Sequence, residues 1–88
     1  MNDQAIQISI IIPVFNEDKS ILRVLKRIYE TVDNRANYEI IVINDGSTDN
    51  TLKILEENHT LYDQLITYET NYGKGNAVKM GLDRKSVV

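Results

Sequence analysis

The feature that most constrains this chain is its alternation between short runs of β-branched residues and longer stretches with helical spacing. The apolar runs at 8–14, 40–43 and 65–68 read as strands, and a segment with apolar residues every three to four positions follows each. The first run is continuous rather than alternating in polarity, which is typical of a strand covered on both faces. Strand–helix–strand crossovers are right-handed in nearly every known case. The order therefore predicts a three-layer α/β/α domain with helices on both faces of a parallel sheet.

Three helices are predicted from apolar stripes and capping residues. Asn16 or Asp18 is expected to cap the first helix, because short polar side chains accept hydrogen bonds from its free N–H groups. Ser47 or Thr48 is expected to cap the second helix in the same way, with Asp49 at the start of that helix. The stripes contain, in chain order, Ile21, Leu25, Ile28, Tyr29 and Val32; Leu52, Ile54 and Leu55; and Ala77, Val78 and Leu82.

Composition and charge exclude several classes of function. The 88 residues carry a formal net charge of −3, which argues against a general nucleic-acid binder. The absence of cysteine excludes disulfides and thiolate metal sites within this chain. No signal pattern begins the chain, and its longest apolar run, residues 10–12, is far shorter than the ~20 residues of a membrane helix. We therefore expect one small cytoplasmic domain without a transmembrane segment.

Polar residues gather where the three predicted strands end, at 15–17, 45–49 and 71–75. Because the carboxyl ends of parallel strands meet at one edge of a sheet, these segments are expected to line a single ligand crevice. Asp45 is a candidate ligand-binding residue, since helix capping does not require a carboxylate at the mouth of the strand. Pro13 is expected to stiffen the first segment, so that its backbone meets a planar base in a fixed pose.

The segment after the third predicted strand has the character of an anion site. Gly73 and Gly75 allow close backbone approach and positive φ just before a predicted helix N-terminus. Lys74 adds a point charge suited to phosphate. The GxxxxGK spacing of a Walker loop is missing, as is a GxGxxG after the first strand. The alternative interpretation is a flexible turn with an exposed lysine.

Three motifs occur in a fixed order: IIIPVFNE at 10–17, INDGSTD at 43–49 and NYGKGNA at 71–77. Each motif alone is modestly specific, whereas all three in this order and spacing are highly specific. Together they resemble the family 2 glycosyltransferases, most closely the polyprenyl-phosphate sugar synthases such as dolichyl-phosphate mannosyltransferase. The resemblance extends from about Ile8 to Leu82 but covers only the first part of the family's catalytic domain.

The resemblance implies a GT-A, Rossmann-like fold, of which residues 1–88 are the N-terminal nucleotide-binding half. It implies sugar transfer with inversion from a UDP- or GDP-linked donor to an acceptor such as a polyprenyl phosphate. The full-length protein is then expected at the cytoplasmic face of a membrane. Carried over by position, the nucleotide-sugar site consists of Pro13, Phe15, Asn16, Glu17, Asp45, Gly46, Asn71 and Lys74.

The resemblance also implies Mg²⁺ or Mn²⁺ as cofactor. In the family a metal-binding DxD-type motif and a catalytic carboxylate follow the part matched here, so their ligands are expected beyond this chain. We therefore expect the chain to be truncated before that motif and inactive alone. Asn44 stands where many relatives have a second aspartate, which is expected to alter ribose contacts.

Two further expectations concern assembly and alternatives. The first strand is the most hydrophobic and is expected to be central, with one edge lacking a neighbour and open to self-association. A different class of function is a stand-alone nucleotide-binding or regulatory module without catalysis. A third interpretation is a flavodoxin-like signalling domain that binds Mg²⁺ without nucleotide, which leaves the glycine-rich segment unexplained.

Overall fold

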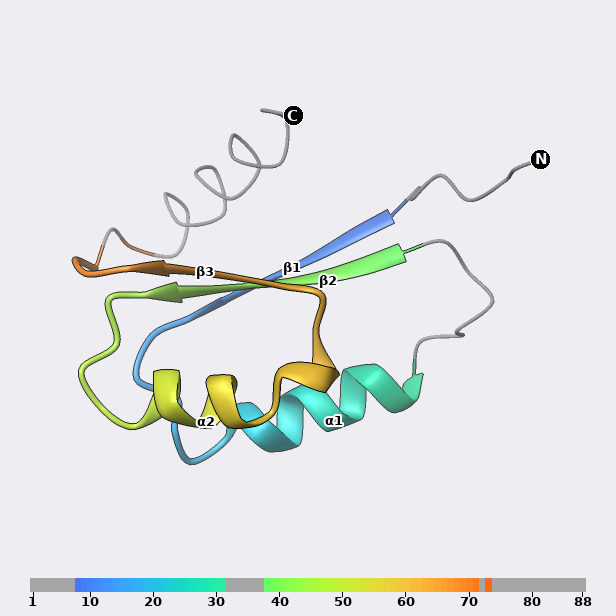
Figure 1. The fold of residues 1–88 in the computed structure, drawn as a ribbon, viewed down its shortest axis with the longest axis horizontal. Helices are drawn as coiled ribbons and strands as arrows, with labels where there is room; N and C mark the ends of the chain where they lie inside the picture. The colour runs from blue at the N-terminus through green and yellow to red at the C-terminus, as the bar shows by residue number, and fades with distance from the viewer. Residues whose placement is uncertain (1–7, 32–37, 72, 74–88) are drawn as a thin grey trace.

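A computed structural model describes residues 8–31, 38–71 and 73 of the chain. The predicted alternation of strands and helices is confirmed over these residues (Figure 1). The elements are β1 (Ile8–Val14), α1 (Ile21–Thr31), β2 (Tyr38–Asp45), α2 (Thr51–Glu57), the 3₁₀ turn η1 (His59–Leu61) and β3 (Gln64–Tyr68). The third predicted helix, with Ala77, Val78 and Leu82, lies outside the described residues.

The three strands form one parallel sheet in the order β1-β2-β3. Within the described sheet β2 lies between the other two strands and one edge of β1 lacks a neighbour, as the usual strand order predicts. A central place for β1 in a larger sheet stays a prediction. All of β2 from Ile40 to Asp45 is buried, whereas most of β1 is only partly buried. Among the described strands β1 has a neighbour on one edge only, and self-association through the other edge stays a prediction. In register, Ile8 pairs with Tyr38, Val14 with Asn44, Ile41 with Gln64 and Asp45 with Tyr68.

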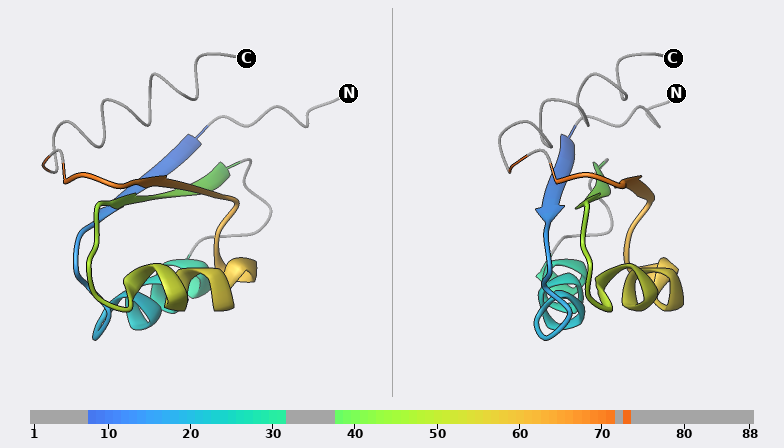
Figure 2. Two further views of the ribbon diagram at one scale, coloured as in Figure 1. Left: turned by 60° about the vertical axis from the view of Figure 1, so that its left-hand side comes forward. Right: turned by 90° about the vertical axis from the view of Figure 1, so that its left-hand side faces the viewer.

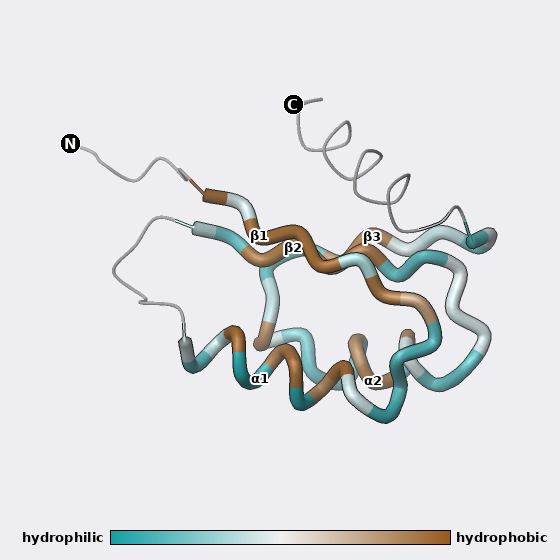
Figure 3. The backbone as a smooth tube through the Cα atoms, turned by 180° about the vertical axis from the view of Figure 1, so that it is seen from behind, coloured by the Kyte–Doolittle hydropathy of each residue, from teal (hydrophilic) through white to brown (hydrophobic). Residues whose placement is uncertain are grey.

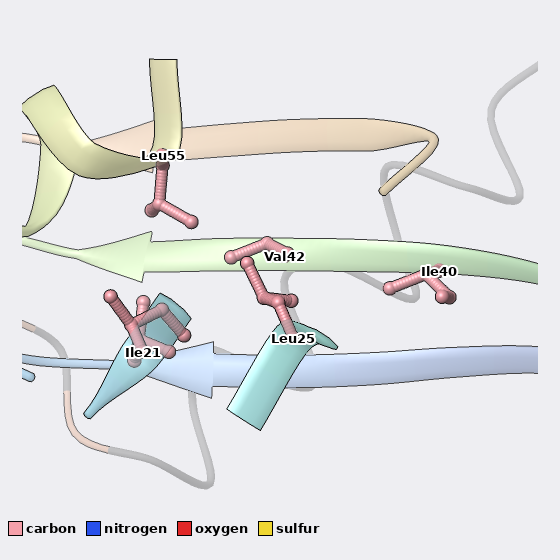
Figure 4. Close-up of a cluster of buried hydrophobic side chains, with 6 residues drawn as sticks. Ile21, Leu25, Ile40, Val42 and Leu55 are labelled. Carbon is pink, nitrogen blue, oxygen red and sulfur yellow. The ribbon is translucent and has the colours of Figure 1, made fainter. Parts of the chain in front are cut away.

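Both described helices cover the same face of the sheet (Figures 1 and 2). Hydropathy follows this arrangement, since β1 is hydrophobic over most of its length and β2 in its middle, while α1 alternates between hydrophobic and hydrophilic residues (Figure 3). The cluster between helices and sheet contains Val14, Ile21, Leu25, Ile40, Val42 and Leu55 (Figure 4). Ile41, Ile43 and Ile66 form a second buried cluster. Because successive strand residues point to opposite faces, this second cluster lies on the other side of β2, as a three-layer fold requires.

The helices differ from their predicted stripes at their margins. Tyr29 is 55 % exposed and is not part of the core, because it lies at the edge of the stripe near the end of α1. α2 is short, and the side chains of Asn58 and Tyr62 accommodate its last turn by donating to the carbonyls of Ile54 and Leu55 at 2.8 and 2.7 Å. No helix in the described ranges is both long and apolar enough to cross a bilayer.

Candidate functional site

A cavity of about 240 Å³ opens at the carboxyl ends of β1 and β2. Its wall is supplied by the end of β1, the end of β2 and the segment after β3, so the three polar segments meet at one sheet edge as the topology predicts. A larger hollow on the outer surface of α1 is shallow and is lined only by α1 and by Lys19 just before it, which makes it a weaker candidate. The residues that line the cavity are Pro13, Val14, Phe15, Asp45, Asn71 and Gly73.

Asp45 supplies the carboxylate of the cavity wall. It is the last residue of β2 and is only 2 % exposed. Strand alternation places its side chain on the face of Ile41 and Ile43, away from α1 and α2. An ionised carboxylate accepts hydrogen bonds from N–H and hydroxyl groups, which are the donors that a nucleobase and a ribose present.

Asn71 holds the segment after β3 against the end of β2. Its Nδ2 donates to the backbone oxygen of Asp45 at 3.0 Å, and its Oδ1 accepts from the backbone N–H of Gly73 at 3.2 Å. Both ends of the amide are thus engaged within the wall. Asn71 therefore shapes the cavity by joining two segments that lie 26 residues apart.

Gly46 follows Asp45 in the chain and lies against the backbone of Thr70 and Asn71. Its φ is +74°, in the region that favours glycine. A Cβ at this position would lie 2.5 Å from the backbone nitrogen of Asn71 and 2.6 Å from the carbonyl carbon of Thr70. Gly46 is not a lining residue, but only a glycine allows the two backbones to approach this closely.

Phe15 and Pro13 line the cavity at the end of β1. Phe15 is 45 % exposed, which is unusual for a large aromatic side chain in a small domain. An exposed ring at the rim of a cavity offers a flat apolar face to a planar group. Pro13 lies two residues before Phe15 and restricts the backbone there, because its ring fixes φ.

Asn16 and Glu17 lie beside the cavity rather than among its lining residues. Asn16 Oδ1 accepts from the backbone N–H groups of Thr48 and Asp49 at 2.7 and 3.3 Å. Glu17 Oε1 accepts from Ser20 Oγ at 2.8 Å, at the start of α1. The side chains of both predicted site residues are thus engaged outside the cavity.

The predictions that Asn16 caps α1 and that Ser47 or Thr48 caps α2 are wrong, because the segments before the two helices bind each other. Asn16 binds the β2–α2 loop (residues 46–50) instead of capping α1, and Ser47 Oγ accepts from the backbone N–H of Asn16 at 2.9 Å. α2 begins only at Thr51, too far along the chain for Ser47 or Thr48 to cap it.

The acceptor at the start of α2 is the carboxylate of Asp49, which confirms the prediction for this residue. Its Oδ1 accepts from the backbone N–H of Thr51 at 2.9 Å, and its Oδ2 accepts from the backbone N–H of Asp18 at 3.2 Å. Burial raises the pKa of Asp49, but hydrogen bonds from Thr51 and Asp18 lower it by more. The net pKa of this carboxyl lies below its ordinary value of 3.8.

The remaining predicted positions are Lys74 and Asn44. Lys74 lies outside the described residues. Asn44 is 1 % exposed and is absent from the cavity lining, because strand alternation turns it toward the helices. Within the described ranges its Oδ1 has no hydrogen-bond partner. The structure therefore places Asn44 away from the wall to which Asp45 belongs.

The described residues do not provide the donor set of a metal site. Over these ranges no group of three or more His, Cys, Asp or Glu side chains is placed to hold a cation. Asp45 is the one carboxylate among the lining residues of the cavity. Divalent cations with oxygen ligands need six or more donors, several of them commonly from carboxylates. These residues alone do not fit the metal that the motifs imply.

Comparisons with known proteins agree with this geometry. The family model for glycosyl transferase family 2 matches residues 9–85. The chain is 38 % identical over 89 positions to dolichyl-phosphate beta-glucosyltransferase of Saccharomyces cerevisiae, covering 91 % of this chain and 27 % of that protein. It is 34 % identical over 82 positions to undecaprenyl-phosphate 4-deoxy-4-formamido-L-arabinose transferase of Proteus mirabilis, covering 89 % of this chain and 25 % of that protein.

A solved structure supports the same assignment. The mannosyltransferase PcManGT of Pyrobaculum calidifontis, in complex with GDP-Man and Mn²⁺, is similar with a TM-score of 0.71 and 29 % identity. The match covers 86 % of this chain and 23 % of that one. The likeness confirms the GT-A, Rossmann-like fold that the motifs imply. The chain spans about a quarter of the length of the curated relatives named above.

The first prediction tests the close approach at Gly46. Gly46→Ala is expected to lower the free energy of unfolding by ~3–4 kcal/mol, because it adds a backbone clash to the cost of a positive φ. Gly73→Ala is the matched control, since Gly73 has φ +88° but a Cβ there would have no atom within 4 Å, so only ~1–2 kcal/mol is expected. Urea unfolding followed by circular dichroism measures both values. Equal losses in the two variants would show that the contact with Asn71 is unimportant.

The second prediction concerns acid stability. Because the pKa of Asp49 is lower in the folded chain than its ordinary value, its carboxylate stabilises the fold above the unfolded pKa. That contribution is lost as the pH falls through the lower folded pKa. Asp49→Asn is therefore expected to unfold with a shallower dependence on pH than wild type from pH ~5 downward. Melting temperatures across this range measure the slope, with the exposed Glu57→Gln as control. A slope unchanged by Asp49→Asn contradicts the assignment.

Proposed function

Because this chain belongs to glycosyltransferase family 2, we propose that it is the donor-nucleotide-binding part of an enzyme that transfers a sugar from a nucleoside diphosphate. The observation that carries the proposal is the cavity between the ends of β1 and β2, with an exposed ring on one wall and a buried carboxylate on the other. Ligands of parallel α/β sheets bind at this edge. The similar mannosyltransferase of Pyrobaculum calidifontis holds GDP-Man together with Mn²⁺.

Each lining residue has a role in this proposal that follows from its chemistry. Phe15 stacks on the base, and Pro13 holds the preceding backbone in place. Asp45 accepts hydrogen bonds from the base or the ribose. Asn71 holds the wall together through the backbone oxygen of Asp45. Lys74, in the glycine-rich segment, binds phosphate by its charge.

The chemical step makes demands that the described residues do not meet. In an inverting transfer an acceptor oxygen attacks the anomeric carbon and the bond to the diphosphate oxygen breaks. A hydroxyl acceptor also passes its proton to a base, whereas an ionised phosphate acceptor has no proton to lose. The leaving diphosphate gains charge, which a divalent cation neutralises. The cavity wall contains Asp45 but no cluster of carboxylates within the described ranges. We therefore propose that these residues bind the donor and that the cation, together with any base that the acceptor requires, acts from elsewhere in the enzyme.

The names of two relatives support a class of acceptor. The proteins of Saccharomyces cerevisiae and Proteus mirabilis named above are described as acting on dolichyl phosphate and undecaprenyl phosphate. We propose a polyprenyl phosphate as acceptor, which implies that the enzyme acts at the cytoplasmic face of a membrane. A phosphate oxygen is a stronger nucleophile than a neutral hydroxyl because it is already ionised at neutral pH.

Donor binding is tested by amide NMR of the 88-residue chain, titrated with UDP, GDP and ATP with and without Mg²⁺. One of UDP or GDP is expected to produce saturable shifts at Asn16, Asp45 and Asn71. Asp45→Asn keeps the shape of the side chain but removes its charge. It is expected to lower the affinity for that nucleotide by ~10–100-fold. Glu57→Gln removes a comparable charge from the exposed surface of α2 and is expected to change nothing.

Two outcomes of this titration would reject the proposal. A dispersed wild-type spectrum that no nucleotide perturbs would show that the cavity is not a nucleotide site in this chain. Shifts produced by Mg²⁺ alone, at Asp45 and without nucleotide, would favour a flavodoxin-like cation site instead.

Catalysis is tested separately from binding. The chain is incubated with UDP-glucose or GDP-mannose, Mn²⁺ and a polyprenyl phosphate, and the lipid product is quantified. No product above the protein-free background is expected, because the described cavity lacks the carboxylates that the step requires. Robust turnover that Asp45→Ala abolishes would show that the chain carries the complete machinery.

A further inference from the structure

We propose that Asn16 is a positioning residue of the nucleotide pocket, which fixes Phe15 at the rim and does not itself contact the ligand. The proposal rests on the proposed function, because Phe15 is the residue that stacks on the base. The sequence motif alone implied that Asn16 lines the pocket. The proposal assigns it a different role, because it acts on a neighbouring residue. Three observations carry it: the saturation of the Asn16 oxygen, the backbone conformation at Asn16 and the contacts of its neighbours.

The side-chain oxygen of Asn16 has no acceptor capacity left for a ligand. It accepts from the backbone N–H of Thr48 at 2.7 Å and from that of Asp49 at 3.3 Å, with Thr48 Oγ1 at 3.5 Å. An amide oxygen has two lone pairs, and two N–H groups already use them. Asn16 is also absent from the residues that line the cavity. Its oxygen therefore serves the protein rather than the nucleotide.

The backbone at Asn16 turns the chain immediately after Phe15. Asn16 has φ +52°, and it is the one non-glycine residue with positive φ in the part of the chain that the structure describes. Asparagine tolerates this conformation better than most residues with a Cβ. Phe15 is 45 % exposed, so packing on its ring restrains it less than it would a buried side chain. The conformation of the next residue therefore has a large share in fixing where the ring lies.

Asn16 begins a set of reciprocal hydrogen bonds, which we call the loop clasp, between residues 16–18 and 47–51. Three consecutive backbone N–H groups, of residues 16, 17 and 18, donate to Ser47 Oγ, Thr51 Oγ1 and Asp49 Oδ2 at 2.9, 2.9 and 3.2 Å. In return the N–H groups of residues 48, 49 and 50 donate to Asn16 Oδ1 and Asp18 Oδ2. Asn16 is the member of the clasp that adjoins the cavity wall.

The clasp connects the two walls of the cavity mechanically. Phe15 precedes residue 16, and Asp45 precedes the β2–α2 loop by one residue. Fixing residues 16–18 to residues 47–51 therefore fixes the ring on one wall relative to the carboxylate on the other. A ligand that contacts both walls binds more tightly when their separation is set in advance.

Three substitutions separate the two properties of Asn16. Asn16→Asp keeps an acceptor oxygen in the same place and tolerates positive φ. Asn16→Gly keeps the backbone conformation but removes the acceptor. Asn16→Ala removes the acceptor and disfavours the conformation. We expect the affinity for UDP or GDP, whichever wild type binds, to fall in the order wild type and Asn16→Asp, then Asn16→Gly, then Asn16→Ala.

A double-mutant cycle with Phe15→Ala tests whether Asn16 acts through the ring. Asn16→Ala is expected to weaken nucleotide binding about tenfold in wild type but no more than about twofold in the Phe15→Ala background. Its effect on the melting temperature is expected to be the same in both backgrounds, because the clasp is present with or without the ring. A purely structural role would instead reduce affinity equally in both backgrounds. Asn16→Gly replaces Asn16→Ala in the cycle if the alanine variant does not fold.

Several results would overturn the proposal. A tenfold loss that persists in the Phe15→Ala background would mean that Asn16 contacts the ligand or acts by another route. Unchanged affinity in Asn16→Ala and Asn16→Gly would mean that the clasp does not position the pocket. If wild type binds neither UDP nor GDP, it is the proposed function that fails. In that case the positioning role is tested by the NMR chemical shifts of the Phe15 ring. Identical shifts in Asn16→Gly and wild type would overturn it.

Discussion

The alternation of side chains along β2 is the constraint on which the rest of the structure depends. Ile40 and Val42 complete the cluster under the helices, and Ile41 and Ile43 complete the cluster on the opposite face. A strand that is buried on both faces has its register fixed, because a slip of one residue would exchange the two sets. The same alternation continues to the end of the strand, where it turns one polar residue toward the helices and presents Asp45 to the cavity.

A small domain with a thin stability margin gains from fixing its loops with polar contacts rather than with more core. The loop clasp uses backbone N–H groups that precede α1 and α2 and that the helices themselves cannot satisfy. Each such hydrogen bond contributes only ~0.5–1.5 kcal/mol. Six of them between two short segments nevertheless hold the segments in one arrangement. The segments before α1 and α2 thus hold each other in place at the cavity edge, because each accepts hydrogen bonds from the other's backbone N–H groups.

The sequence predicts the elements of the fold well, because strands and helices follow from local patterns. The three apolar runs correspond to β1, β2 and β3, and the convergence of their carboxyl ends follows from parallel topology alone. Capping rules describe a side chain and the N–H groups two or three residues after it, so they cannot anticipate two loops that exchange donors. Asn16 reads as a local cap, yet its partners lie about 32 residues away in the chain. Gly46 likewise reads as a turn residue, whereas its closest constraint is the backbone at Thr70 and Asn71.

The proposed division between donor binding and chemistry follows from the same topology. Both walls of the cavity are built from segments that lie within the first 73 residues, so a short part of the polypeptide shapes the proposed donor pocket. A cation site needs several carboxylates at one place, and the alternation of β2 brings only one to the cavity wall. Relatives about four times as long have the additional chain from which such ligands can come. In the proposed function, nucleotide binding therefore depends on strand order and loop contacts, whereas the transfer step depends on residues added to that frame.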